Sequence, residues 1–369
     1  YWDHKQDSLI TDAINMTDRL KSRHYNRSSY DSKLSPAALK NAYTRFLNSF
    51  DKEYGGFGKS PKFPKPHDYL FLLKYSLRDP GSKSFEMVEK SLKEMRMGGM
   101  YDQIGFGFHR YSTDSKWLVP HFEKMLYDQA LLIHAYLETY IYTNDIYYKN
   151  VVEEIIEYVL RDMTSDMGGF YSAEDADSKG EEGLFYIWTI DQIRSELNND
   201  DSQFIIDVLN LDEKGNWHDG KNDKTNIPYL TNLWEEIAAI SNQDVDGIMN
   251  KFNRIRQILF NIREKRVHPQ KDDKILTDWN GLMISALAKS AMIFDNQEYK
   301  EAAIEATDFI LNNLRDEDGG LLKHYTDGPS IQKGLIEDYS FFIWGLIEMY
   351  QLTFNPDYLE NAIELSNYQ

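Results

Sequence analysis

One stretch of the chain, residues 101–128, combines side chains that can exchange protons with rings that can stack on a sugar face. Its acid–base candidates are His109, His121, Glu123 and Asp128, and its binding candidates are Tyr101, Arg110 and Trp117. Imidazoles and carboxylates grouped in this way predict acid–base chemistry on a bound substrate. The alternative is structural, since a histidine more often fills a core than acts on a ligand.

A second loop, residues 170–183, concentrates acids around Tyr171, Glu174 and Asp175. Crowded carboxyl groups shift one another's pKa values, which suits general acid–base work. A calcium loop of the EF-hand type is excluded, because a count from Asp175 puts Lys179 and Tyr186 where oxygen ligands are needed. The alternative is a solvated acidic turn.

Asp128 and three further acids stand near the starts of strongly apolar segments, the three being Asp68, Asp278 and Asp338. Their neighbours include His67, Trp279 and Asn280, which add an imidazole, a stacking ring and an amide. If the segments are helices that begin at one end of the protein, these side chains meet there. The alternative is ordinary capping, because an acid near a helix N-terminus accepts hydrogen bonds from free amides.

Composition narrows the classes of partner and cofactor. The chain has 369 residues, no cysteine and a formal net charge of −19, which disfavours nucleic acid and anionic lipid as partners. No apolar run is long enough to span a bilayer, and a cytoplasmic location is the default expectation. We find no serine elbow, phosphate loop, zinc signature or dinucleotide fingerprint, so no cofactor and no metal are expected.

The elements that would position these groups repeat along the chain. Four times an amphipathic helix is followed by Gly-Gly and an apolar residue, at Gly55-Gly56-Phe57, Gly98-Gly99-Met100, Gly168-Gly169-Phe170 and Gly319-Gly320-Leu321. Glycine just past a helix end favours the left-handed cap conformation. Each loop then leads into a helix that is apolar nearly all round, such as those opening at 69–73 and 282–288.

A helix without a polar face is buried on every side, and one with a single apolar face lies outside it. The alternation predicts an all-α fold, an (α/α)6-type toroid of helical hairpins with short β segments in its loops, incomplete at the C-terminus. Residues 171–277 form an irregular insertion, with a strand near 183–189, helices near 190–199, 202–210, 232–241 and 245–266, and a polar loop over 212–227.

Several motifs carry a family resemblance. They are the segments at 55–64, 117–129, 171–178 and 278–284, and they resemble the spermatogenesis-associated, thioredoxin-domain-containing family. The resemblance implies a thioredoxin-like domain followed by a six-hairpin toroid similar to N-acylglucosamine 2-epimerases and six-hairpin glycosidases. Residues 1–24 would then be a connection from a thioredoxin-like domain that this chain lacks, and residues 25–369 the toroid.

These observations favour a carbohydrate-active enzyme that acts on a sugar or glycan. Epimerisation would use two bases, with His67 and His109 or His121 as candidates, whereas glycoside hydrolysis would use two of the carboxylates. The second hypothesis is a non-catalytic module that binds a glycan or a client of the thioredoxin-like domain. The third is a scaffold whose pocket is closed by Trp117 and Tyr171.

Overall fold

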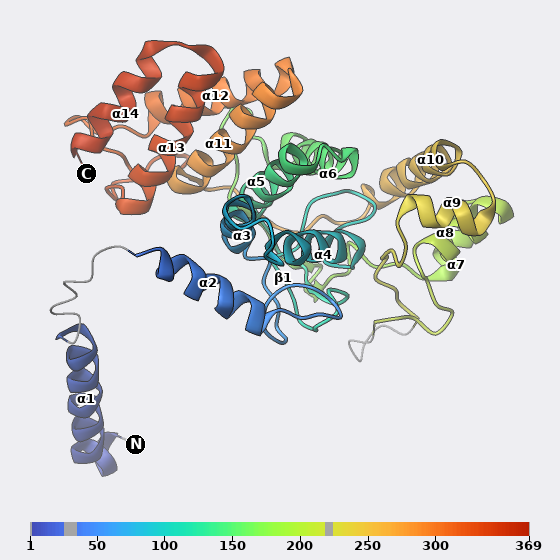
Figure 1. The fold of residues 1–369 in the computed structure, drawn as a ribbon, viewed down its shortest axis with the longest axis horizontal. Helices are drawn as coiled ribbons and strands as arrows, with labels where there is room; N and C mark the ends of the chain where they lie inside the picture. Colours follow the sequence, from blue (N-terminus) through green and yellow to red (C-terminus); the bar gives the residue numbers. More distant parts are fainter. Residues whose placement is uncertain (1, 26–34, 218–223, 369) are drawn as a thin grey trace. The chain divides into compact units, whose positions relative to one another are not determined.

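The computed structural model describes residues 2–25, 35–217 and 224–368. Its internal contacts divide the chain into two units, residues 1–46 and 47–369. The first unit holds α1 (Trp2–Tyr25) and most of α2 (Pro36–Ser49) (Figure 1). The apolar stripe of α2 is at most half-buried, for example at Phe46. The sequence-based domain boundary at 24/25 stays a prediction.

The second unit is built from an inner and an outer row of helices. The inner helices α3 (Pro66–Arg78), α5 (Leu126–Thr143), α11 (Thr277–Phe294) and α13 (Ile336–Thr353) pack side by side in that order. The outer helices are α4 (Ser84–Met97), α6 (Ile146–Tyr158), α12 (Gln297–Asn313) and α14 (Pro356–Tyr368). Each outer helix packs against the inner helix before it (Figure 1). The predicted alternation of inner and outer helices is confirmed.

Burial along the inner row differs between its middle and its ends. Helices α5 and α11 are buried on nearly every side, as their sequences predict. The same expectation is wrong for α3 and α13, where Leu77 is 63% and Ile347 39% exposed. Within the described residues these two helices end the row, so each keeps one face without an inner neighbour.

The Gly-Gly pairs follow α2, α4, α6 and α12 as tight turns, and in three of the four the first glycine has positive φ. Gly319, at φ +87°, is typical: the next amide, that of Gly320, donates to Asp316 Oδ1 at 2.7 Å. Gly98 is the exception, with an extended backbone at φ −65°. A Cβ at Gly98 would lie 2.3 Å from the Trp117 carbonyl oxygen, so close packing explains that glycine.

Short strands tie the loops together where the inner helices begin, which confirms the predicted β segments. One sheet joins β3 (Lys124–Met125), β4 (Ala173–Glu174) and β7 (Lys271–Asp272) in that order. A second joins β8 (Ile275–Leu276), β9 (His324–Thr326) and β10 (Gly328–Pro329). Two pairs are local, β1 (Tyr111–Ser112) with β2 (Pro120–His121) and β5 (Asp177–Ser178) with β6 (Glu181–Glu182).

The insertion contains α7 (Ile190–Glu196), α8 (Asn199–Val208), α9 (Trp234–Ser241) and α10 (Val245–Arg263), close to the four helices expected. These lie together, apart from α11–α14 (Figure 1), around a core that includes Ile205 and Ile255. The predicted strand at 183–189 is wrong. Residues 183–186 form a turn, with the amides of Tyr186 and Ile187 donating to the Gly183 carbonyl, and Trp188 makes an isolated antiparallel bridge to Asn226. Part of the expected loop at 212–227 lies outside the described residues.

Among the described helices, none combines the length and the apolar character that crossing a membrane requires.

Between α6 and the loop at 164–170 the chain widens into a π-helical turn, η1 (Val159–Met163). Such turns are rare and occur frequently at functional sites. Here the turn carries Tyr158 and Asp162 toward the loops that contain β4 and β7.

Candidate functional site

Two predicted acids, Asp278 and Asp338, meet where the inner helices begin, an end of the row that we call the mouth. The amide of Asp278 donates to Asp338 Oδ1 at 3.1 Å. The Lys323 ammonium lies 2.7 Å from Asp278 Oδ2 and 3.0 Å from Asp338 Oδ1. Burial lowers the pKa of Lys323, but its bonds to the two acids raise it overall. Asp338 also accepts from the Leu335 amide at 2.7 Å, so capping and ion pairing coexist there.

Asp128 differs from these two acids because, among the described residues, it neither caps its helix nor forms an ion pair within 4.0 Å. It is only 6% exposed, and its Oδ2 accepts no hydrogen bond from the described part of the chain. Burial raises the pKa of Asp128 well above its ordinary value, the Arg110 guanidinium opposes this, and the Glu123 carboxylate reinforces it. Burial therefore favours the protonated form of Asp128 over the charged form.

The Glu123 side chain is held in place by two neighbours. Arg110 Nη1 donates to its Oε2 at 2.8 Å, and His121 Nε2 lies 3.2 Å from the same oxygen. The other ring nitrogen of His121 lies 2.7 Å from Glu182 Oε1. The His121 ring is stacked on Tyr111 with centroids 5.1 Å apart. These contacts hold Glu123 against Arg110, and the charges of both residues act on Asp128.

Two aromatic rings lie next to the acids. Tyr127 and Trp279 meet edge to face with centroids 4.8 Å apart, one residue from Asp128 and from Asp278 respectively. Both are partly exposed. Rings of this kind can pack on the apolar face of a sugar while neighbouring polar groups bind its hydroxyls.

A polar hollow of about 460 Å³ adjoins Glu123, and it is lined by Glu174, Asp175 and residues 270–274 among others. Strand pairing sets Lys124, Glu174 and Lys271 in one row across β3, β4 and β7. The Tyr158 hydroxyl donates to Glu174 Oε2 at 2.7 Å. The Lys271 ammonium lies 4.0 Å from Glu174 Oε1 and donates to the Asp162 carbonyl.

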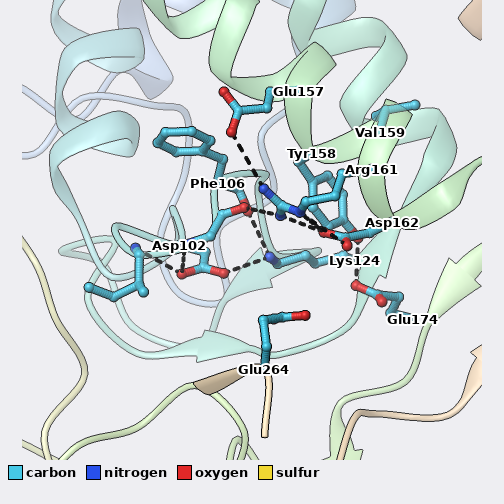
Figure 2. A network of polar contacts seen from close by, with 12 residues as sticks. Asp102, Phe106, Lys124, Glu157, Tyr158, Val159, Arg161, Asp162, Glu174 and Glu264 are labelled. Carbon is cyan, nitrogen blue, oxygen red and sulfur yellow. Dashed lines mark hydrogen bonds and ion pairs between the residues drawn. The ribbon is translucent and has the colours of Figure 1, made fainter. Parts of the chain in front are cut away.

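A buried charge network surrounds Asp102 and Lys124, next to β3 (Figure 2). Lys124 Nζ donates to Asp102 Oδ2 at 2.9 Å, and Arg263 Nη1 donates to Asp102 Oδ1 at 2.8 Å. Burial would raise the pKa of Asp102, but Arg263 and Lys124 hold it well below its ordinary value. Burial lowers the pKa of Lys124. The network joins α10 of the insertion to β3, which carries the chain from Glu123 into α5.

Two predicted binding rings lie in the interior instead. Tyr101 has no exposed surface, and its hydroxyl donates to Glu154 Oε2 at 2.8 Å. Trp117 also has no exposed surface, and its indole donates to the Tyr54 carbonyl at 2.8 Å. Neither ring can contact a ligand from these positions, so the expectation that they bind substrate is wrong for this structure. The buried Trp117 also cannot close a pocket, as the third hypothesis requires.

Two predicted polar candidates are likewise engaged inside the protein. His109 is 1% exposed, its Nδ1 lies 3.0 Å from the Phe122 carbonyl, and burial followed by the Lys124 charge lowers its pKa to about 3. A neutral buried ring of this kind is structural. Asn280 exchanges two hydrogen bonds with the Phe170 backbone, at 2.8 and 2.9 Å, and so holds a Gly-Gly loop against α11.

The remaining candidates stay near the surface. His67 is exposed, with Nε2 3.3 Å from Asp68 Oδ1 at the start of α3. Tyr171 is half-buried, with the Lys271 ammonium 5.7 Å from its ring centre. Asp175 is exposed on the rim of the hollow, and its Oδ1 accepts from the Asp177 amide at 3.1 Å.

Three site residues escaped sequence reasoning: Tyr127, Lys271 and Lys323. Tyr127 directly precedes Asp128, and the matching position before Asp278 is Thr277, so adjacency to a candidate acid is its only signal. The lysines carry no signal, because strand pairing between distant loops brings them to the acids. Over the described residues, no cluster of three or more histidine, aspartate or glutamate side chains is arranged to hold a metal ion.

Comparison with known proteins gives relatives for the sequence and for the fold. No protein-family model matches the chain. It is 33% identical to human spermatogenesis-associated protein 20 over 404 residues, and 32% identical to an uncharacterised Caenorhabditis elegans protein over 370 residues. All of this chain is covered in the first comparison and 92% in the second, but the chain spans only about half the length of either relative.

Two solved structures share the fold. A glycoside hydrolase family 76 mannosidase from Bacteroides thetaiotaomicron has a TM-score of 0.50 at 11% identity, covering 90% of this chain and 70% of that one. An α-mannanase of the same family and organism has a TM-score of 0.51 at 14% identity, covering 91% and 70%. The fold is thus that of the (α/α)6 toroids found in carbohydrate-active enzymes, and over its whole length the chain is homologous to about half of spermatogenesis-associated protein 20.

Proposed function

We propose that the protein hydrolyses a glycosidic bond in a neutral glycan, with Asp128 as the proton donor and Glu123 as the carboxylate that activates water. The proposal depends most on the contrast between these two carboxyl groups. Asp128 is buried without a partner for Oδ2 among the described residues, whereas Glu123 is paired with Arg110 and His121. A buried carboxyl group without a charged partner suits a proton donor, and a partly exposed carboxyl group bound by Arg110 suits a base.

The proposed step uses both groups at once. The Asp128 proton passes to the glycosidic oxygen as the bond to the anomeric carbon breaks. Water attacks that carbon and gives a proton to Glu123, and solvent exchange then returns the proton to Asp128. The Tyr127 and Trp279 rings supply a stacking surface for the sugar at this position.

Two further observations favour glycan hydrolysis over epimerisation. The two structures that share the fold are named as a mannosidase and an α-mannanase. Epimerisation by a pair of imidazoles has less support, because His109 is buried and the exposed His67 lies beside Asp68 at the start of α3.

The test is a hydrolysis screen with 4-nitrophenyl glycosides and neutral oligosaccharides, read as released nitrophenol or reducing ends. Asp128→Asn and Glu123→Gln should each lower kcat by at least about 100-fold, the usual contribution of a general acid or base. Asp191→Asn, an exposed acid on α7, is the matched control and should leave kcat unchanged.

Two outcomes would reject hydrolysis. Glycan binding without turnover would identify a binding module instead. If no neutral glycan binds or is hydrolysed, the mouth is not a glycan site and the proposal fails entirely.

A further inference from the structure

The hollow beside Glu123 does not include Asp128 in its lining, but it includes Glu123, the other carboxyl group of the proposed reaction. Glu123 lines the hollow and is also the carboxylate bound by Arg110. Its volume of about 460 Å³ lies in the range of small-molecule sites. A ligand at Asp128 could therefore continue past Glu123 into this space.

The walls of the hollow are fixed by main-chain pairing. Met125, Ala173 and Asp272 form one row across the three strands, and Lys124, Glu174 and Lys271 form the next. Side chains directly opposite in paired strands lie on the same face of the sheet. Charges along the second row alternate in sign, so Glu174 lies between two ammonium groups.

Two of these charged side chains, Glu174 and Lys271, bind to the end of α6 and to the π-helical turn that follows it. Tyr158 donates its hydroxyl to Glu174, and the Asp162 carbonyl accepts from Lys271. Glu174 keeps 9% of its side chain exposed, and Lys271 keeps 35%. Polar groups held in this way lose little conformational freedom when a ligand binds.

The chemistry of the lining suits a ligand with many hydroxyls. Lys271, Lys274 and Gln270 can donate hydrogen bonds, and the carboxylates of Glu174 and Asp175 can accept them. Carboxylates outnumber ammonium groups along the lining, because Glu123, Asp272 and Asp273 also border it. An anionic sugar would meet an unfavourable potential there.

We propose that the hollow is a second subsite, which binds the next unit of a neutral glycan and makes the preferred substrate an oligosaccharide rather than a monosaccharide. The inference rests on the proposed function, since it places the first unit at Asp128. Lys271 and Glu174 are the residues that would recognise the second unit.

The experiment is calorimetric titration of the full chain with mannose, mannobiose and the uronic acid of mannobiose, with glucose and cellobiose in parallel. All proteins carry Asp128→Asn, which prevents turnover. The neutral disaccharide should bind at least tenfold more tightly than its monosaccharide, and the uronic acid more weakly than the neutral disaccharide. Lys271→Met should reduce the tenfold preference below threefold without changing the affinity for the monosaccharide.

Two other variants serve as controls for this experiment. Lys214→Met replaces an exposed lysine in a loop and should keep the full preference. Asp273→Asn lies on the rim, outside the sheet, and should selectively improve binding of the uronic acid even if Lys271→Met fails to fold. Equal affinities for monosaccharide and disaccharide would overturn the subsite while leaving the proposed function intact. Absence of binding by every sugar would overturn both.

Discussion

Asp128 gains its chemical character from its surroundings rather than from its sequence position. Asp278 and Asp338 both lie in the first turns of their helices and share Lys323, whereas Asp128 Oδ2 is buried and accepts no hydrogen bond from the described residues. Position near a helix start thus predicts where these acids lie along the chain but not which of them is left unpaired.

The raised pKa of Asp128 predicts a pH-dependent cost to stability. The folded protein keeps this proton to higher pH than the unfolded chain, whose carboxyl groups titrate near pH 4. The free energy of unfolding should therefore fall as pH rises from that range through the folded-state pKa of Asp128. Asp128→Asn has no such proton, so its stability relative to wild type should be greater at pH 7 than at pH 4 in urea unfolding. A constant difference between the two proteins would refute the assignment.

Tyr158 and Tyr101 provide a second comparison at the level of single residues. Both are buried tyrosines that donate to a carboxylate, but Glu154, the acceptor of Tyr101, also receives two hydrogen bonds from Arg96. Tyr158→Phe leaves one oxygen of the buried Glu174 without its donor and should lower the free energy of unfolding by about 1–3 kcal/mol. Tyr101→Phe should cost less in the same denaturant titration, and the reverse order would contradict the role given to Tyr158.

Asn280 was expected to bind substrate, but its side chain binds the protein backbone instead. Asn280 exchanges hydrogen bonds with the Phe170 backbone, and Gln129 does the same with the Phe108 backbone. The shared role appears only when α5 and α11 are compared in space, because the two amides follow their acids at different offsets. A polar residue beside candidate acids resembles a ligand-binding group in sequence, whichever way its side chain turns.

At the scale of elements, α11 and α13 approach each other through two glycines. A Cβ at Gly281 would lie 2.5 Å from the Phe342 amide nitrogen, and a Cβ at Gly345 would lie 3.0 Å from the Gly281 carbonyl oxygen. Gly281→Ala should therefore force the helices apart and lower the free energy of unfolding by about 1–3 kcal/mol, despite its better helix propensity. Gly81→Ala, where the nearest atom is 3.8 Å from the added carbon, is the control for chemical denaturation. Equal stabilities of the two variants would show that the helices can separate at little cost.

The alternation of inner and outer helices was predictable from the sequence. In α5 and α11 the apolar residues lie all around the helix axis, and both helices are buried on nearly every side. The strand expected at 183–189 failed because a short apolar run fits a buried turn equally well. Strand pairing between β3, β4 and β7 could not be predicted, since each strand has two residues and no alternating pattern. That pairing decides which charged residues line the hollow, so this half of the candidate site was beyond sequence analysis.

For the second unit as a whole, the inner row predicts a gradient of stability. Helices α5 and α11 have inner neighbours on both sides within the described residues, whereas α3 and α13 have one. Amides open for hydrogen exchange most slowly where burial is complete. Exchange followed by mass spectrometry should find the slowest amides in α5 and α11 and faster ones in α3 and α13. Slower exchange in α13 than in α11 would show that stability is not organised by the inner row.

The three-stranded sheet at the mouth has a consequence for how such proteins can change. Each of its strands supplies two residues from a different loop, and the chain positions are separated by whole helices. A loop transplanted alone from a relative would bring its own length and twist, and the other two would lose their partner. New specificities at this mouth would therefore arise through matched changes in several loops, inherited together as a set.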